Sequence, residues 1–436
     1  MEKKILVGIL VCLLLYSCNG VNPLTGRLAK TPPYKKYIQS LHEAELDKTA
    51  MALAWIRAGE NALQDSVTVT LPFSESGYFN ASEPGARSYR FGAREGQVLT
   101  VNGAVKTKQG PGFFMDLFTW EGNEWIPLAH GDSTFNLTYE FDKDYAQCLI
   151  RIQPELLVTA YYIINISLTP VLINPVAGAT NKSIGSFYGD SRDGGKRKHE
   201  GVDIFAEKGT PVIAPTGGYI SRVGTSALGG KVVWLQDPKR GHSYYFAHLD
   251  SQAVKTGAKV NKGDIIGTIG NTGNAKYTPS HLHFGIYQSK SKDPVHYIRT
   301  LEATVSALPW DTTFTQPDFK VTSKTVALRL GPGEKHISAA MLKKDTYLQV
   351  IAQSNSWYRV LLPNKKQGFV PKSKIAAIQK GKRLRVKDAT ILLSETHQKA
   401  VPLAHLQAAT SVEELASFEN FRYVRTREGL VGWLMI

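Results

Sequence analysis

The sequence predicts a mainly β protein built from several domains, and three observations support this. The chain has 436 residues, which is too long for one ordinary hydrophobic core. Short apolar runs that alternate with polar residues recur along the chain, and Gly, Pro, Asn and Asp separate them. With 42% hydrophobic and 20% charged residues, the composition is that of folded domains rather than disordered chain.

The first 33 residues predict export and a lipid anchor. A start with two lysines precedes the apolar run Ile5–Leu15, which is typical of a secretory signal peptide and too short for a membrane span. The run ends in a sequence that resembles a bacterial lipobox, with Cys18 in the place of the acylated cysteine. We expect residues 1–18 to be a lipoprotein signal peptide and residues 19–33 to be a tether. An ordinary signal peptide with an incidental cysteine is the alternative.

Residues 34–172 predict short helices followed by a β-sandwich-like domain. Apolar residues from about 34 to 57 fall at helical spacing. From Ser66 the spacing changes to strict alternation, and several short strand-like runs follow. Cys148 lies in one of these runs and is expected to be a buried thiol, because a lipidated Cys18 leaves it no disulfide partner. No catalytic constellation occurs here, so a spacer and a binding module both stay open.

Residues 176–300 hold the residues that predict chemistry. In the sequence His199-Glu200-Gly201-Val202-Asp203, a straight strand would hold His199 and Asp203 about 13 Å apart. Two zinc ligands must each come within about 2 Å of one ion, so the chain must bend, and Gly201 permits a bend. A helical zinc motif is the competing interpretation, but the glycine and the β-branched residues that follow oppose it.

Three further histidines complete the predicted site. In the alternating run from Pro279 to Tyr287, His281 and His283 share one face of a strand and apolar residues share the other. One imidazole of this pair can bind a metal while its neighbour handles protons. His248 ends another strand-like run and supplies a second proton-handling group.

The order His-x-x-x-Asp, His, His-x-His resembles the lysostaphin/LytM-type zinc metallopeptidases. The resemblance covers roughly residues 183–297 and includes a Gly-Thr-Pro-Val sequence at 209–212. It implies one zinc ion held by His199, Asp203 and His283, with His248 and His281 flanking the reacting carbonyl. It also implies an antiparallel β domain with a groove across its sheet. Two departures from the family pattern, Pro279-Ser280 and Gly285, put substrate preference in doubt.

The remainder of the chain resembles bacterial SH3-type domains. After a linker at about 307–317, residues 320–378 contain a Leu-Arg-x-Gly-Pro opening, a Trp-Tyr-x-Val run and a Gly-Phe-Val run. Residues 380–436 repeat the ending order but lack a clear opening, so they predict a second, divergent small barrel.

The leader predicts an exported, lipid-anchored protein, and the resemblance implies that it is a zinc endopeptidase that cuts cross-link or bridge peptides of peptidoglycan. The net charge of +15 suggests anionic partners. No basic cluster has the aromatic interleaving of a nucleic-acid platform, so we expect no nucleic-acid partner. The resemblance implies peptidoglycan as a partner and the lipid on Cys18 implies a membrane surface, and we expect a monomer. The alternatives are a non-catalytic wall-binding or amidase-activating lipoprotein and a peptidase acting on a protein target.

Overall fold

The computed structural model describes residues 31–107, 112–132, 134–300, 308 and 318–435. The expected signal peptide with Cys18, most of the expected tether, and all but one residue of the expected linker at 307–317 lie outside the described residues. Within the described parts of the chain, no helix is both long and apolar enough to cross a membrane.

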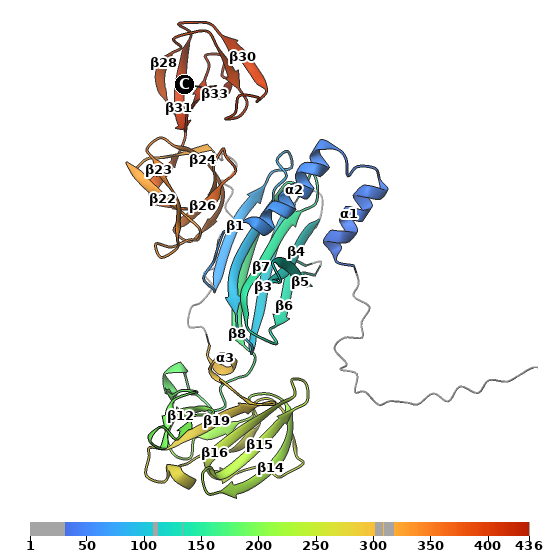
Figure 1. The fold of residues 1–436 in the computed structure, drawn as a ribbon, viewed down its shortest axis with the longest axis vertical. Helices are drawn as coiled ribbons and strands as arrows, with labels where there is room; N and C mark the ends of the chain where they lie inside the picture. Colours follow the sequence, from blue (N-terminus) through green and yellow to red (C-terminus); the bar gives the residue numbers. More distant parts are fainter. Residues whose placement is uncertain (1–30, 108–111, 133, 301–307, 309–317, 436) are drawn as a thin grey trace, which may run out of the picture.

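The fold is mainly β and multidomain, as the sequence predicts (Figure 1). A β-sandwich with two helices occupies the middle of the molecule. A ten-stranded unit lies at one end, and two small barrels follow one another at the other end.

The sandwich consists of two antiparallel sheets, with strand orders β1-β8-β3-β6 and β2-β7-β4-β5. Side chains between the sheets are fully buried, among them Tyr89, Leu99 and Ile164. The elements are α1 (Pro33–Glu43), α2 (Ala50–Gln64), β1 (Phe73–Phe79), β2 (Arg87–Ala93), β3 (Gln97–Thr107), β4 (Phe113–Glu121), β5 (Glu124–His130), β6 (Asn136–Glu140), β7 (Tyr145–Pro154) and β8 (Ala160–Pro170).

Helix α2 is longer than the sequence predicted, and the extended run after it is not a regular strand. The Thr49 hydroxyl accepts from the Ala52 N–H and caps the helix, while Trp55 on its buried face donates from Nε1 to the Pro154 carbonyl at 2.7 Å. The alternating residues from Ser66 bury Val67 and Val69 but form only an isolated bridge, between Thr68 and Arg90. Backbone bonds tie this segment to Arg90 and, through the Thr68 N–H, to the Leu330 carbonyl, so it is extended and half-buried without being assigned as a strand.

Cys148 in β7 is buried and free. Burial raises the pKa of its thiol to about 12, so it is an unreactive part of the sandwich core.

The ten-stranded unit is antiparallel, with seven strands in the order β17-β14-β15-β16-β19-β12-β9 and three more, β13, β18 and β20, paired beside this path. Strands β10 and β11 form a separate two-stranded sheet. Short 3-10 turns occur at Asn181–Ser183, Asp193–Gly195 and Gly273–Ala275. The elements are β9 (Ile184–Ser186), β10 (Ser191–Arg192), β11 (Arg197–Lys198), β12 (Val202–Phe205), β13 (Pro211–Ile213), β14 (Gly218–Ser226), β15 (Gly230–Asp237), β16 (His242–Gln252), β17 (Lys259–Val260), β18 (Ile265–Ile269), β19 (His281–Tyr287), β20 (Ser291–Lys292) and α3 (Val295–Ile298).

The two C-terminal barrels repeat one strand order. In the first, β21 pairs with β24, and the path continues β24-β25-β26-β22-β23; in the second the path is β28-β31-β32-β33-β29-β30. The elements are β21 (Asp318–Val321), β22 (Thr325–Arg329), β23 (Ser338–Lys343), β24 (Tyr347–Ser354), β25 (Trp357–Leu361), β26 (Gln367–Pro371), β27 (Ile375–Ala377), β28 (Lys382–Arg385), β29 (Thr390–Leu393), β30 (Pro402–Leu406), β31 (Ser411–Phe418), β32 (Phe421–Arg425) and β33 (Val431–Met435), with a 3-10 turn at Lys372–Lys374.

The first barrel is continuous with the sandwich, which the sequence did not predict. Strand β24 pairs with β1 at Ser76↔Gln353 and Gly77↔Ala352, so one sheet runs through both units. The barrel residue Phe369 belongs to the sandwich core. The sequence pattern predicted two separate units and could not show that they share an edge, because pairing between distant strands leaves no local signal.

Candidate metal centre

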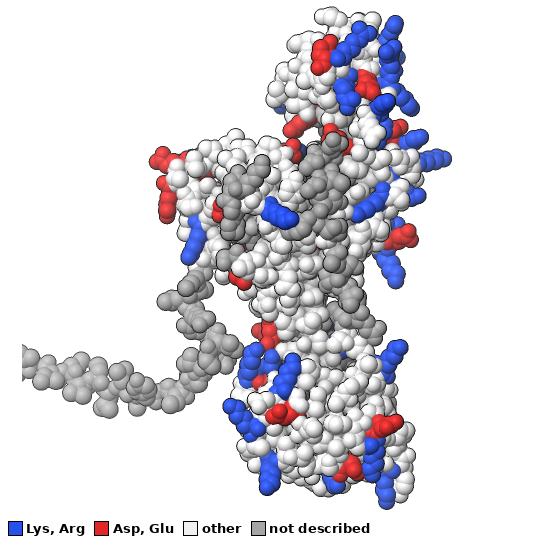
Figure 2. Space-filling model, turned by 180° about the vertical axis from the view of Figure 1, so that it is seen from behind, with Lys and Arg blue, Asp and Glu red and all other residues white. Residues whose placement is uncertain are grey.

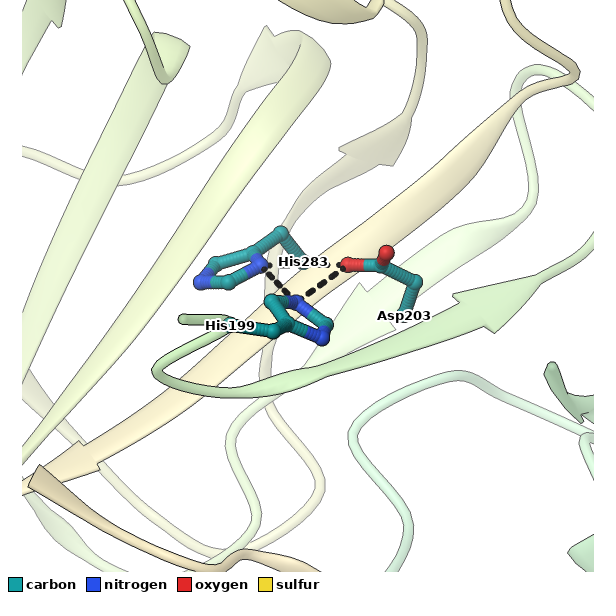
Figure 3. A group of neighbouring side chains, drawn as sticks. All are labelled: His199, Asp203 and His283. Atoms are coloured by element: carbon teal, nitrogen blue, oxygen red, sulfur yellow. Dashed lines mark hydrogen bonds and ion pairs between the residues drawn. The ribbon is translucent and has the colours of Figure 1, made fainter. Parts of the chain in front are cut away.

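Three polar side chains converge near the start of β12. Asp203 in β12 lies directly opposite His283 in β19, and His199 precedes β12 on the same side. His199 Nε2 lies 2.9 Å from His283 Nδ1 and 3.0 Å from Asp203 Oδ1, and His283 Nδ1 lies 3.1 Å from Asp203 Oδ1 (Figure 3). The three candidate ligands from the sequence therefore present one atom each to a common point.

The triangle fits a tetrahedral zinc ion. Three ligand atoms at ordinary zinc distances are about 3.3–3.4 Å apart in a tetrahedral site. The observed edges of 2.9, 3.0 and 3.1 Å are shorter by a few tenths of an ångström. One carboxylate and two imidazoles are also the donor set of catalytic zinc sites, which leave the fourth position to water.

The close approach of the chain at Gly201 to β19 makes this convergence possible. A Cβ on Gly201 would lie 2.5 Å from the Phe284 carbonyl oxygen and 2.9 Å from the His283 ring. A side chain at this position would push β12 away from β19 and separate Asp203 from His283. The glycine therefore serves close approach as well as the bend that the sequence suggested.

His281 lies on the same face of β19 as His283. Leu282, Phe284 and Ile286 point the other way and are fully buried, as the alternation predicts. His281 Nδ1 lies 2.8 Å from the Pro279 carbonyl oxygen, which can only accept, so Nδ1 carries the proton. Its Nε2 lies 4.0 Å from Asp203 Oδ1 and so faces the cluster.

His248 reaches the site through a β-bulge. It has a φ of 63°, and the β15–β16 register shifts around it. Without the bulge, its side chain would alternate onto the core side with Phe246; instead Leu249 fills the core and His248 turns outward. The rings of His248 and His281 lie 5.0 Å apart between centroids. Nδ1 of His248 donates to the Thr272 carbonyl at 2.9 Å, which again leaves Nε2 free.

Burial and charge tune these groups in different directions. Burial lowers the pKa of His248 to about 4, so its ring is neutral at neutral pH. Burial also lowers the pKa of His283. Burial alone would raise the pKa of Asp203, but hydrogen bonds from His199 and His283 outweigh it and hold the carboxyl well below its usual range. Asp203 is thus held as a carboxylate and the His283 ring is favoured in its neutral form, as metal binding requires of both ligands.

The site lines an open cavity of about 610 Å³ that contains all five predicted residues. The sandwich contacts this unit elsewhere: Lys292 pairs with Glu95 at 2.7 Å, and Arg240 pairs with Glu140. These contacts lie near the start of β16, whereas His248 lies near its end. Among the described residues, none from the sandwich or the barrels lines the cavity.

Sequence reasoning missed Arg192. Its Nη2 lies 2.8 Å from Asp203 Oδ2, 2.5 Å from Ser186 Oγ and 2.9 Å from His199 Nδ1. It stands on the hairpin β10–β11, seven residues before His199, a spacing that belongs to no ligand motif. The only signal in the sequence was a basic residue close to the first motif.

Two segments of the chain match models of known protein families. Residues 197–295 match the model of peptidase family M23, and residues 322–376 match that of the bacterial SH3 domain. An L-Ala--D-Glu endopeptidase of Bacillus subtilis is 36% identical over 141 residues, which is 29% of this chain and 43% of the relative. The murein hydrolase activator NlpD of Escherichia coli is 33% identical over 113 residues, which is 26% of this chain and 28% of the relative.

Among solved structures, the catalytic domain of the antimicrobial peptidase lysostaphin from Staphylococcus simulans is 37% identical. The match covers 26% of this chain and 87% of that domain, with a TM-score of 0.24. The chain spans less than half of the length of the curated relatives it matches.

Proposed function

We propose that this chain, which carries a peptidase family M23 domain followed by a bacterial SH3 domain, is a zinc-dependent endopeptidase of peptidoglycan. The observation that supports this most directly is the geometry of five side chains. Three ligand atoms converge on one point, and beside them the rings of His248 and His281 each turn Nδ1 to a backbone carbonyl and Nε2 away from it.

In this proposal His199, Asp203 and His283 hold the metal. When bound, a zinc ion supplies a Lewis acid for the scissile carbonyl and lowers the pKa of water toward about 7. His248 and His281 each can accept a proton at Nε2, because their Nδ1 protons are committed to backbone carbonyls. One ring takes the proton of the attacking water and returns it to the departing amine, so amide and water become carboxylic acid and amine.

The remaining parts of the chain would bring the enzyme to its substrate. The SH3-type barrels would hold the wall, and lipid on Cys18 would hold the chain at a membrane of the cell envelope. The name of the Bacillus subtilis relative makes the bond between L-Ala and D-Glu of the peptide stem the first bond to test.

A second candidate function is activation of another wall hydrolase without catalysis. The name of the Escherichia coli relative, a murein hydrolase activator, favours it. The presence of all five site residues favours the enzyme, because an activator needs neither metal ligands nor bases.

The proposal is tested by mass spectrometry of the soluble fragments that the protein from residue 19 onward releases from purified peptidoglycan. The reaction is run with zinc, with a chelator, and with His283→Ala. We expect new peptide termini with zinc that vanish with the chelator and in the variant.

Binding to the wall without new termini under every condition would favour the activator. Cleavage of a protein sample but not of peptidoglycan would place the substrate among proteins. The mass of the new termini identifies the bond.

A further inference from the structure

Arg192 contacts the outer atoms of the candidate metal ligands. Asp203 offers Oδ1 to the cluster, and Arg192 Nη2 lies 2.8 Å from the opposite oxygen, Oδ2. His199 offers Nε2, and its Nδ1 faces the Phe187 carbonyl at 2.9 Å and Arg192 at 2.9 Å. A ring bound through Nε2 keeps its proton on Nδ1, so the carbonyl is then its acceptor and Arg192 serves Asp203 and Ser186.

The guanidinium is held in place independently of the metal. Ser186 Oγ accepts from Nη2 at 2.5 Å and itself donates to Asp190 Oδ2 at 3.0 Å. The hairpin that carries Arg192 is fixed by backbone bonds between Gly189 and His199 and between His199 and Asp190, both 2.8 Å. Arg192 therefore approaches Asp203 from a braced position.

A carboxylate can bind a metal through one oxygen or through both. Asp203 is largely buried, so within the described residues few groups compete for its second oxygen, and Arg192 is the cation that reaches it. A charge-assisted hydrogen bond of this geometry is among the stronger ones in proteins.

We propose that Arg192 is a positioning residue that occupies Oδ2 of Asp203, so that Asp203 binds the metal through Oδ1 alone. One coordination position is thereby kept for water instead of being taken by the second carboxylate oxygen. The proposal rests on the proposed function, in which His199, Asp203 and His283 hold the ion, and it deepens the account of that site.

The test replaces zinc with cobalt(II), whose visible absorption is stronger in four-coordinate than in five-coordinate sites. In Arg192→Gln, Oδ2 is released and Asp203 can chelate, so we expect a severalfold loss of visible absorption per bound cobalt. We also expect kcat of the zinc enzyme to fall about 10- to 100-fold, with KM changed less. Metal affinity would not distinguish the outcomes. Loss of the positive charge of Arg192 should raise the affinity of Asp203 for a metal cation, whereas loss of the contact that orients Asp203 should lower it.

Arg197→Gln is the matched control. It removes the same charge from the same hairpin, but Arg197 pairs with Asp193 and does not contact the ligands. Its cobalt spectrum should equal that of the wild type. Arg192→Lys keeps the charge but not the planar fork, and we expect a spectrum between those of the wild type and Arg192→Gln.

A cobalt spectrum of Arg192→Gln identical to that of the wild type would overturn the inference. If thermal unfolding with chelator shows that Arg192→Gln does not fold, the cobalt spectrum of Arg192→Lys is the test. A spectrum of Arg192→Lys identical to that of the wild type would then overturn the inference. If the wild type binds neither cobalt nor zinc, the proposed function itself fails, which is a different result.

Discussion

His248 illustrates how one residue departs from the regular strand to reach a site. Its left-handed backbone and bulge turn the ring out of the core and toward His281. Such a conformation is disfavoured for a non-glycine residue and is retained where the surrounding structure fixes it. Here the Thr272 carbonyl and the backbone bond from His248 to Gly229 at 2.7 Å fix it.

Replacing His248 should separate proton transfer from metal binding. We expect His248→Gln to lower kcat by about 10²- to 10⁴-fold, because a positioned base contributes on that scale. Zinc content should be unchanged, since His248 is not one of the three converging ligands. Turnover on peptidoglycan and metal analysis check both parts. His296→Gln, in the same domain but outside the site, should keep wild-type turnover, and loss of zinc from His248→Gln would contradict the assigned role.

The buried ring of His248 also predicts a pH dependence of stability. Its pKa is about 4 in the folded chain against an ordinary value of 6.5, so between these values the unfolded chain binds a proton that the folded chain does not. In metal-free protein this contribution is complete above about pH 6.5 and is lost as the pH falls toward about 4. His283, whose pKa is also lowered, acts in the same direction.

Denaturant unfolding with chelator at about pH 7 and about pH 5 measures this effect. We expect the wild type to lose stability toward the acidic end, and His248→Gln to lose less. Equal losses in the two proteins would show that His248 is not buried as described.

At the scale of elements, each barrel uses the same strand position to contact the unit before it. In the first barrel, Arg359 of β25 is fully buried and pairs with Asp65 at 2.9 Å and Glu75 at 3.7 Å. In the second barrel the corresponding position of β32 is Tyr423, whose hydroxyl donates to Asp318 at 3.1 Å. The repeated strand order is thus accompanied by a repeated mode of stacking.

Removing the Arg359 contact should destabilise the first barrel and the sandwich as one cooperative unit. Arg359→Leu leaves the fully buried Glu75 without its cation, so we expect the free energy of unfolding to fall by about 3–5 kcal/mol. Calorimetry of the full chain measures this as a lower transition temperature of the unit that contains both parts. Arg425→Gln, which removes a partly exposed pair with Glu413, should cost less than about 1 kcal/mol. Equal effects of the two variants would contradict the shared core.

At the scale of the whole molecule, charge is unevenly divided among the units. Residues 318–436 contain 20 Lys and Arg against 9 Asp and Glu, which is +11, and residues 176–300 contain 17 against 9, which is +8. Residues 34–175 contain 11 against 16, which is −5. Figure 2 shows many Lys and Arg side chains over the two barrels and over the ten-stranded unit. The cationic units are those for which we propose contact with the wall.

This division predicts salt-sensitive binding to peptidoglycan. Salt screens interactions between charges more than about 10 Å apart at 0.1 M. The amount of protein that sediments with purified peptidoglycan should therefore fall severalfold from low to high salt. Lys382, Arg383 and Arg385 on β28 are exposed, and changing all three to Gln should weaken low-salt binding. The matched control changes Lys35, Lys36 and Lys48 of the sandwich helices and their connection to Gln. Salt-independent binding would show that binding is not electrostatic, and equal effects of the two triple variants would show that the charge of the barrels has no special part in it.

The sequence by itself determined the β class and predicted the candidate site residues, whose roles are those that the resemblance to the zinc metallopeptidases implies. Both depend on short-range patterns: alternation puts His281 and His283 on one face, and a glycine between His199 and Asp203 allows the chain to turn. The tertiary structure alone decided three other features. These are the bulge that aims His248, the contact of Arg192 with Asp203, and the sheet shared by the sandwich and the first barrel. Each joins strands or loops through backbone geometry and distant pairing, and such contacts have no fixed spacing along the chain that a sequence pattern could reveal.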